Sequence, residues 1–181
     1  MSYIGFSAIL LFVLTCLNQA AAASDHEIYY IATANSLDRC TDSVQTCLTL
    51  SQIAANLSRL LHRNTTLVFL PGTHYLSSID LTFSDFDNFV MKSENSIAAQ
   101  IKCTSYSRIH FHQSQSIHIS NLEFIGCRRS LVSLIKQLLI ADTKFEGQEN
   151  GGTALEMVET AAQIVNSTFV SNRIGSSTGR K

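Results

Sequence analysis

Apolar and polar residues alternate in a unit that the second half of the chain contains three times. Each unit is a short apolar run, then Asn or Asp, then two residues and a phenylalanine. The three units are Ser116–Gly126, Gln137–Gly147 and Ala162–Ser171. Their phenylalanines lie 21 and 24 residues apart. A repeat of this period is typical of a solenoid, in which each unit stacks on its neighbours.

The alternation inside each unit predicts β-strands. Ile117 and Ile119 alternate before the asparagine of the first unit, and Leu122 and Phe124 alternate after it. Helical repeats would need apolar residues three and four apart, and leucine-rich repeats would need L-x-x-L-x-L, and neither spacing is present. Short strands joined by tight polar turns favour an all-β parallel β-helix. The alternative interpretation is three unrelated β-hairpins of chance similarity.

Two sets of equivalent residues follow from this interpretation. A polar ladder at one turn is predicted to contain Asn121, Asp142 and Asn166. A stack of aromatic rings inside the coils is predicted to contain Phe124, Phe145 and Phe169. Asn and Asp suit the first position because their side chains can bond one another and they tolerate a left-handed backbone.

Before the coils the apolar period changes to that of a helix. Leu50, Ile53, Leu57 and Leu60 follow the three-and-four spacing of an amphipathic helix. Thr49 is followed three residues later by Gln52, and this pair predicts a capping box at the start of the helix. A solenoid has an open apolar end that must be covered, so we expect this helix to cap the first coil. About five coils are expected, the last of them incomplete.

The chain therefore divides into four predicted segments. Residues 1–23 contain an apolar run and a small-residue cleavage region, as in a secretory signal peptide. Residues 24–65 hold a first strand, a disulfide loop and the capping helix. Residues 66–172 form the coils, and residues 173–181 form a polar tail. The tail offers no second cap, which favours either a fragment of a longer protein or an end that meets a partner.

Cysteines and sequons fit a secreted protein. Beyond the signal peptide the cysteines are Cys40, Cys47, Cys103 and Cys127. An even number suggests disulfides, and we favour Cys40–Cys47 as a local loop and Cys103–Cys127 as a bridge between coils, with free buried thiols as the alternative. The N-x-S/T sequons are at Asn56, Asn64 and Asn166. Asn166 also belongs to the polar ladder, so Asn56 and Asn64 are the better expected acceptors.

Charge and candidate chemistry narrow the function only slightly. The formal net charge is −1, so no nucleic-acid partner is implied, and membrane contact is not expected apart from the signal peptide. His110 and His112 would face outward together, and His118 could add a third metal ligand, but a solvated polar strand explains them as well. No cofactor or metal is predicted.

Three stretches carry a resemblance to a known family: Cys47–Ile53, Leu67–His74 and Asn121–Cys127. They resemble the N-terminal part of secreted right-handed parallel β-helix proteins of the pectin-lyase-like superfamily. The most similar members are the large, mostly uncharacterised extracellular proteins of sponges and other simple animals. The resemblance implies a right-handed β-helix, with a helix that caps the stack and a strand that opens the first coil.

The resemblance also implies where catalysis would lie. Enzymes of this fold cleave acidic polysaccharides with calcium-binding acidic clusters or paired carboxylates. The candidate acidic residues in this chain are Asp85, Asp87, Glu94, Glu123 and Asp142. They do not recur at one position in successive coils, so no catalytic residue is assigned. We expect a non-catalytic extracellular module that binds a glycan or matrix protein. The alternatives are a polysaccharide lyase or glycoside hydrolase, and a truncated non-functional copy of a longer protein.

Overall fold

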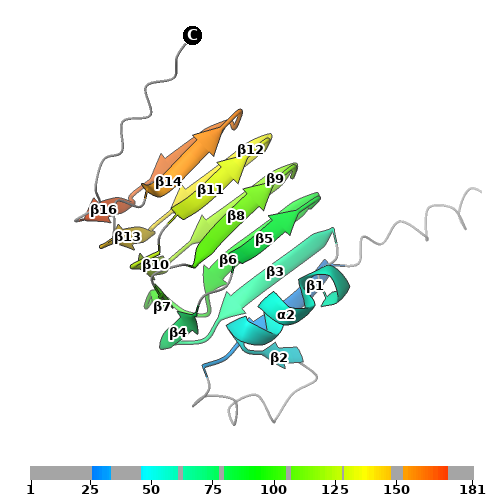
Figure 1. The fold of residues 1–181 in the computed structure, drawn as a ribbon, viewed down its shortest axis with the longest axis vertical. Coiled ribbons are helices and arrows are strands. Elements are labelled where there is room, and N and C mark those ends of the chain that lie inside the picture. Colours follow the sequence, from blue (N-terminus) through cyan, green and yellow to red (C-terminus); the bar gives the residue numbers. More distant parts are fainter. Residues whose placement is uncertain are drawn as a thin grey trace, which may run out of the picture.

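The strands stack into a parallel β-solenoid with a single helix at its N-terminal end in the described part of the chain (Figure 1). The computed structural model describes residues 26–33, 46–60, 63–77, 80–104, 107–127, 129–147 and 153–170. The predicted signal peptide and the polar tail lie outside these residues. The fold is all-β and fits the predicted right-handed β-helix.

Three parallel sheets form the walls, and we call them sheets A, B and C. Within the described residues, sheet A has seven strands: β15 (Ala162–Val165), β12 (Gln137–Ala141), β9 (Ser116–Ser120), β6 (Asn88–Ser93), β3 (Asn64–Phe69), β1 (His26–Ile31) and β2 (Thr46–Leu48). Sheet B has five: β16 (Thr168–Val170), β13 (Lys144–Glu146), β10 (Leu122–Ile125), β7 (Ala99–Cys103) and β4 (Thr73–Leu76). Sheet C has four: β14 (Thr153–Val158), β11 (Arg129–Ser133), β8 (Arg108–His112) and β5 (Asp80–Ser84).

Each coil passes through sheets A, B and C in turn. The described residues make about four turns, from β3 to β14, and β15 with β16 begins another. This agrees with the expected number of coils, the last being incomplete. The predicted repeat therefore corresponds to the A-to-B corner of coils three, four and five.

Inward-facing side chains stack on their equivalents in the next coil. Phe124 and Phe145 lie 5.0 Å apart between ring centroids with an interplanar angle of 8°. Phe145 and Phe169 lie 5.0 Å apart at 5°. In sheet C, Phe83 and Phe111 stack at 5.3 Å. Alternate residues of each strand point to opposite faces, so parallel register brings the same apolar position together in every coil.

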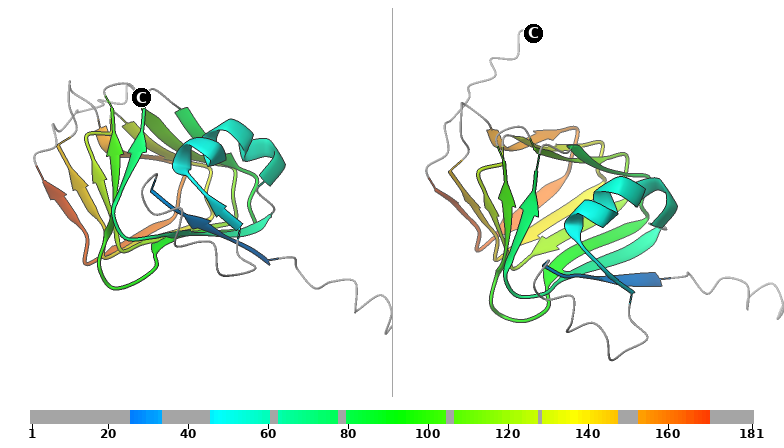
Figure 2. Two further views of the ribbon diagram at one scale, coloured as in Figure 1. Left: turned by 90° about the horizontal axis from the view of Figure 1, so that it is seen from below. Right: turned by 60° about the horizontal axis from the view of Figure 1, so that its bottom comes forward.

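The N-terminal end is closed by α2 (Leu50–Leu60), as Figure 2 shows. The Thr49 backbone N–H donates to Gln52 Oε1 at 2.7 Å, and the Gln52 N–H donates to Thr49 Oγ1 at 3.3 Å, so the predicted capping box is present. Leu50 and Ile53 are buried in the core. The helix contacts β4 and β5, which begin sheets B and C. It therefore occupies the place of a preceding coil beneath those two sheets.

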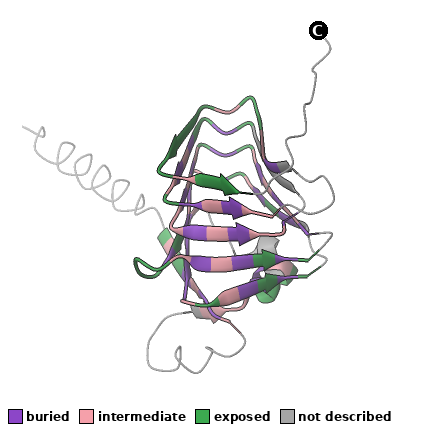
Figure 3. Cartoon of the chain, turned by 90° about the vertical axis from the view of Figure 1, so that its left-hand side faces the viewer, coloured by how far each residue is buried: buried purple, intermediate pink, exposed green. Residues whose placement is uncertain are grey.

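The last coil has no such cover within the described residues. Ile164 and Phe169 occupy inward positions, yet 40% and 46% of their surface is exposed. Figure 3 shows the same change as green strands at one end of the stack, above strands with buried purple residues. Burial of an inward side chain thus requires a neighbouring coil or the helix on both sides.

A disulfide joins two adjacent coils. Cys103 ends β7, Cys127 follows β10, and their Cα atoms are 4.7 Å apart. The predicted Cys103–Cys127 bridge is therefore present. Cys40 lies outside the described residues, so the Cys40–Cys47 pairing stays a prediction.

Candidate functional site

The predicted polar ladder lies at the corner between sheets A and B. Asn121, Asp142 and Asn166 have φ angles of 54°, 49° and 46°, so all three adopt the left-handed backbone. Asn166 Nδ2 donates to Asp142 Oδ1 at 2.6 Å. Asn121 Nδ2 donates to the carbonyl oxygen of Asn95 in the preceding coil. These bonds between coils give the ladder a structural role at the turn.

A second ladder runs along the outward face of sheet B. Thr73 Oγ1 donates to Gln100 Oε1 at 3.0 Å, and Gln100 Nε2 donates to Glu123 Oε2 at 2.8 Å. Lys144 Nζ donates to Glu123 Oε1 at 2.8 Å and also pairs with Glu146. The hydrogen bond from Lys144 lowers the pKa of Glu123. The carboxylates of Glu123 and Glu146 raise the pKa of Lys144 to about 12.

This second ladder does not favour catalysis. A general acid or nucleophile needs a carboxyl group that is available to substrate. Glu123 is held instead by a lysine and an amide from the coils on either side. The bonds tie coils two, three and four together.

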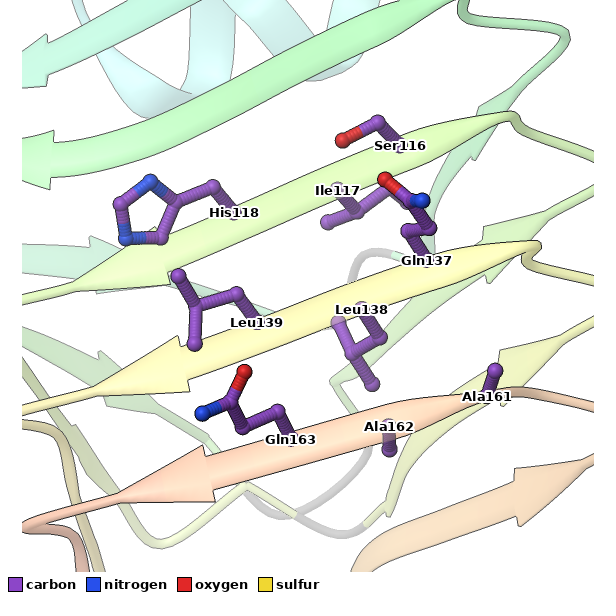
Figure 4. Close-up of a pocket in the computed structure, with 9 residues that line it drawn as sticks. All are labelled: Ser116, Ile117, His118, Gln137, Leu138, Leu139, Ala161, Ala162 and Gln163. Carbon is purple, nitrogen blue, oxygen red and sulfur yellow. The ribbon is translucent and has the colours of Figure 1, made fainter.

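A groove lies on the outward face of sheet A. It has a volume of about 560 Å³ and crosses β9, β12 and β15. Figure 4 shows two rows of side chains in it. One row is His118, Leu139 and Gln163, which pair in register across the three strands. The other row contains Ser116 and Gln137, also paired in register, followed by Ala161.

The groove residues can bind hydroxyl groups without charge. Gln137 and Gln163 each present an amide that both donates and accepts, and His118 presents an imidazole. Leu139 supplies an apolar surface between His118 and Gln163. The described residues that line the groove include no Asp, Glu, Lys or Arg. This pattern suits a neutral polar ligand with apolar faces, such as a sugar chain.

Of the acidic residues suggested by the enzyme hypothesis, Glu123 and Asp142 line one hollow together with Lys144, and the other three do not line it. Asp85 follows β5 with a φ of 65°, and Glu94 follows β6. Asp87 lies 3.8 Å from the guanidinium of Arg63, and both side chains are largely exposed. Glu123 and Asp142 belong to the two ladders. None of the five lines the groove of sheet A.

The histidines are also separated. His110 and His112 lie on β8 of sheet C, whereas His118 lies on β9 of sheet A. Within the described ranges, no group of three His, Cys, Asp or Glu residues is arranged to hold a metal ion.

The sequons occupy three different settings. Asn56 lies in α2, and Asn64 begins β3, where its Oδ1 accepts a hydrogen bond from Asn88 Nδ2 at 3.0 Å. Asn64 therefore keeps its own amide nitrogen out of that bond. Asn166 uses its amide nitrogen to bond Asp142. The preference for Asn64 over Asn166 as an acceptor is consistent with these contacts, and glycosylation stays a prediction.

Comparison with known proteins adds no relative: no family model matches the chain, and neither the curated proteins nor the solved structures contain a significant match. The structure shows a parallel β-solenoid, but none of the comparisons shows membership of the pectin-lyase-like superfamily. No helix in the described part of the chain has the length and apolar character needed to cross a membrane.

Sequence reasoning missed the groove and the ladder of sheet B. A signal for the ladder was present, because Glu123, Lys144 and Thr168 each lie two residues after the ladder Asn or Asp. The groove had a weaker signal: Ser116 and Gln137 open their repeat units. Neither signal specifies which side chains lie side by side until the coils are paired.

Proposed function

We propose that this protein is a non-catalytic extracellular binding module whose ligand is an extended neutral glycan lying in the groove of sheet A. The supporting observation is the uncharged groove across three parallel strands, with its two rows of side chains. The proposal refines the expectation of a glycan or matrix-protein ligand.

The spacing of the groove suits a polymer. Neighbouring strands of a sheet lie about 4.8 Å apart, and alternate residues on one strand lie about 6.7 Å apart. A pyranose ring is of similar size, so successive sugars can meet successive strands. Hydroxyl groups would bond Gln137 and Gln163, while the apolar face of one ring would pack on Leu139. The binding energy would come from several such contacts of modest strength.

The contents of the groove argue against the lyase and hydrolase alternative. Glycoside hydrolysis uses two carboxyl groups flanking the bond, and lyases of acidic polysaccharides need cationic and acidic groups. The residues lining the groove contain neither. An acidic polysaccharide would also find no cation there to offset its charge.

The extracellular location is part of the proposal. A disulfide between coils is compatible with an oxidising compartment. The apolar N-terminal run and the three sequons point the same way. Mass spectrometry of the protein expressed through a secretory pathway tests this. We expect a mature chain without residues 1–23 that carries glycans, and an unprocessed chain without glycans would contradict it.

Binding is tested with soluble fluorescent polysaccharides by fluorescence anisotropy. We expect binding to a neutral polymer such as mannan or xylan, and none to polygalacturonate. Gln137→Ala and Gln163→Ala should each weaken binding about tenfold, which corresponds to one lost hydrogen bond. Thr82→Ala, at an exposed outward position of β5, is the matched control and should bind normally.

Two results would contradict the proposal. One is an absence of binding to every neutral polymer, with or without binding to matrix proteins. The other is binding that survives Gln137→Ala and Gln163→Ala together, since the ligand would then lie elsewhere.

A further inference from the structure

The outward face of sheet A continues beyond the groove, toward the capped end of the stack. The groove row that contains Ser116 is extended in register by Asn88 on β6 and Asn64 on β3. The groove row that contains His118 is extended in register by Val90 on β6. Figure 4 shows the green strand β6 beside β9, on the face that carries the groove side chains. The face of the groove therefore crosses five strands, from β3 to β15.

Each row repeats one kind of chemistry from strand to strand. The first row presents an uncharged polar side chain on four successive strands. Its members are Asn64, Asn88, Ser116 and Gln137. The second row places apolar or imidazole surface beside these groups on β6, β9 and β12. Its members there are Val90, His118 and Leu139. Each of these strands thus offers a hydrogen-bonding group next to a surface on which a sugar ring can pack.

The absence of charge distinguishes these two rows from the outward faces of the other sheets. Outward positions of sheet B include Glu123 and Lys144, and those of sheet C include Arg108 and Glu156. The two described rows of sheet A contain no Asp, Glu, Lys or Arg from β3 to β15, and Lys92 lies in the next row. A neutral polymer can therefore lie across both rows without burying an unpaired charge.

Asn64 and Asn88 keep hydrogen-bonding capacity for a ligand. Asn88 Nδ2 donates to Asn64 Oδ1 at 3.0 Å, so this bond uses one polar atom of each amide. Asn88 Oδ1 can still accept, and Asn64 Nδ2 can still donate. On β3 the second row is closed, because Thr66 is only 5% exposed and its hydroxyl oxygen lies 3.0 Å from His26 Nε2. Asn64 is thus the residue through which β3 can contact a ligand.

We propose that the groove is one part of a longer site, the sheet A track, which consists of the groove together with Asn64, Asn88 and Val90. The track binds a linear neutral glycan of about five sugars, one for each strand. This rests on the proposed function of the groove. The sugars run across the strands, with hydroxyl groups on the first row and ring faces on the second. From β3 to β15 the track is four strand spacings long, or about 19 Å.

The test is isothermal titration calorimetry of the full chain with β-1,4-linked mannan and xylan oligosaccharides of three and of five sugars. The titrations use Asn64→Gln, because a glycan on Asn64 would cover the β3 end of the track and glutamine keeps an amide there. A trisaccharide can fill the groove across β9, β12 and β15, whereas a pentasaccharide also reaches β6 and β3. At least one pentasaccharide should bind about tenfold more tightly than its trisaccharide, because the two further strands add contacts of modest strength.

Asn88→Ala separates the track from the groove. Asn88 is exposed, so its loss should leave the fold intact. It should weaken pentasaccharide binding several-fold and leave the trisaccharide Kd unchanged, whereas Gln163→Ala should weaken the binding of both. Thr82→Ala, on the outward face of sheet C, is the matched control and should change neither affinity.

The predicted glycan on Asn64 gives an independent readout. Secreted chain that mass spectrometry shows to carry this glycan should bind the trisaccharide as tightly as Asn64→Gln does, and the pentasaccharide less tightly. Asn56→Gln removes the predicted acceptor on α2, which contacts β4 and β5 of the other two sheets. It should therefore alter neither affinity.

The outcomes distinguish the track from the groove. Equal affinities for the trisaccharide and the pentasaccharide, or pentasaccharide binding that Asn88→Ala leaves unchanged, would overturn the track and leave the groove in place. Equal pentasaccharide affinity with and without the Asn64 glycan would have the same meaning. If none of the oligosaccharides binds, the groove itself is rejected, and the track with it.

Discussion

The two ends of the solenoid use similar inward residues in opposite circumstances. At the N-terminal end Ile53 of α2 is completely buried against the first coil. In the last coil Ile164 holds an inward position of sheet A, but 40% of its surface is exposed. The hydrophobic effect depends on the apolar area removed from water, so the same residue type stabilises the two ends unequally. The capping helix thus supplies the apolar contact that each coil otherwise obtains from the neighbouring coil.

The largest effect is expected from the aromatic stack. Phe145 lies between Phe124 and Phe169 and is 2% exposed, whereas Phe169 has only one ring neighbour among the described residues. Phe145→Ala should lower the free energy of unfolding by about 3–5 kcal/mol, and Phe169→Ala by less than half as much. Urea unfolding followed by circular dichroism measures both. Equal losses would mean that the last coil is covered in solution.

The isoleucine pair tests the cap directly. Ile53→Ala should lower the free energy of unfolding by about 2–5 kcal/mol, because it opens a cavity between α2 and the first coil. Ile164→Ala should cost about 1 kcal/mol or less, since its side chain already contacts water. Equal urea midpoints for the two variants would contradict the conclusion that the helix buries one end while the last coil stays exposed.

The disulfide lies between the two ends, so its removal should weaken the stack without uncovering either end. It closes a loop with a sequence separation of 24 residues. Replacing both Cys103 and Cys127 with serine should lower the free energy of unfolding by roughly 3 kcal/mol, mainly by freeing the unfolded chain. Differential scanning calorimetry of the double variant, beside the reduced unmodified chain, measures this. Unchanged melting temperatures in both samples would contradict it.

The smallest expected effect is a pH dependence at the capped end. Burial lowers the pKa of His74 from its ordinary value of 6.5. Below about pH 6.5 the unfolded chain therefore binds a proton that the folded protein does not. The stabilising contribution is complete above that pH and is lost as the pH falls towards the folded pKa. The free energy of unfolding, measured with urea, should be lower at about pH 5.5 than at about pH 7.5. His74→Gln should reduce this difference.

Glu123 provides the control in the middle of the stack. Its pKa is lowered by Lys144, so its contribution is present above its ordinary value of 4.5 and is lost only as the pH falls through the lower folded value. Between about pH 7.5 and about pH 5.5 it stays ionised in both states. Glu123→Gln should therefore leave the pH dependence in that range intact. If the pH dependence disappeared in Glu123→Gln, it would arise from Glu123 in the middle of the stack and not from His74 at the capped end.

Much of the fold was predictable because it depends on local periodicity. Alternation around Ile117 and Ile119 specifies which face is buried, and the Thr49–Gln52 pair specifies where the helix begins. The spacing of Cys103 and Cys127 matched one coil, so their pairing could be predicted. Two strands of sheet C, β11 and β14, were not predicted. Their pairing shifts register between Arg129 and Leu131, and such an irregularity leaves no regular period in the sequence.

The candidate sites depended on the tertiary structure. Side chains in a solenoid meet across coils, and the coils differ in length: equivalent partners are 24 residues apart for Asn64 and Asn88, 28 for Phe86 and Ser114, and 21 for Glu123 and Lys144. One fixed sequence separation therefore does not specify the neighbours in every coil. The sequence by itself determined the strands of sheets A and B that follow the repeat, their buried faces and the cap. Only the pairing register between coils decided that Gln137 and Gln163 share a groove and that His74 lies beside the start of α2.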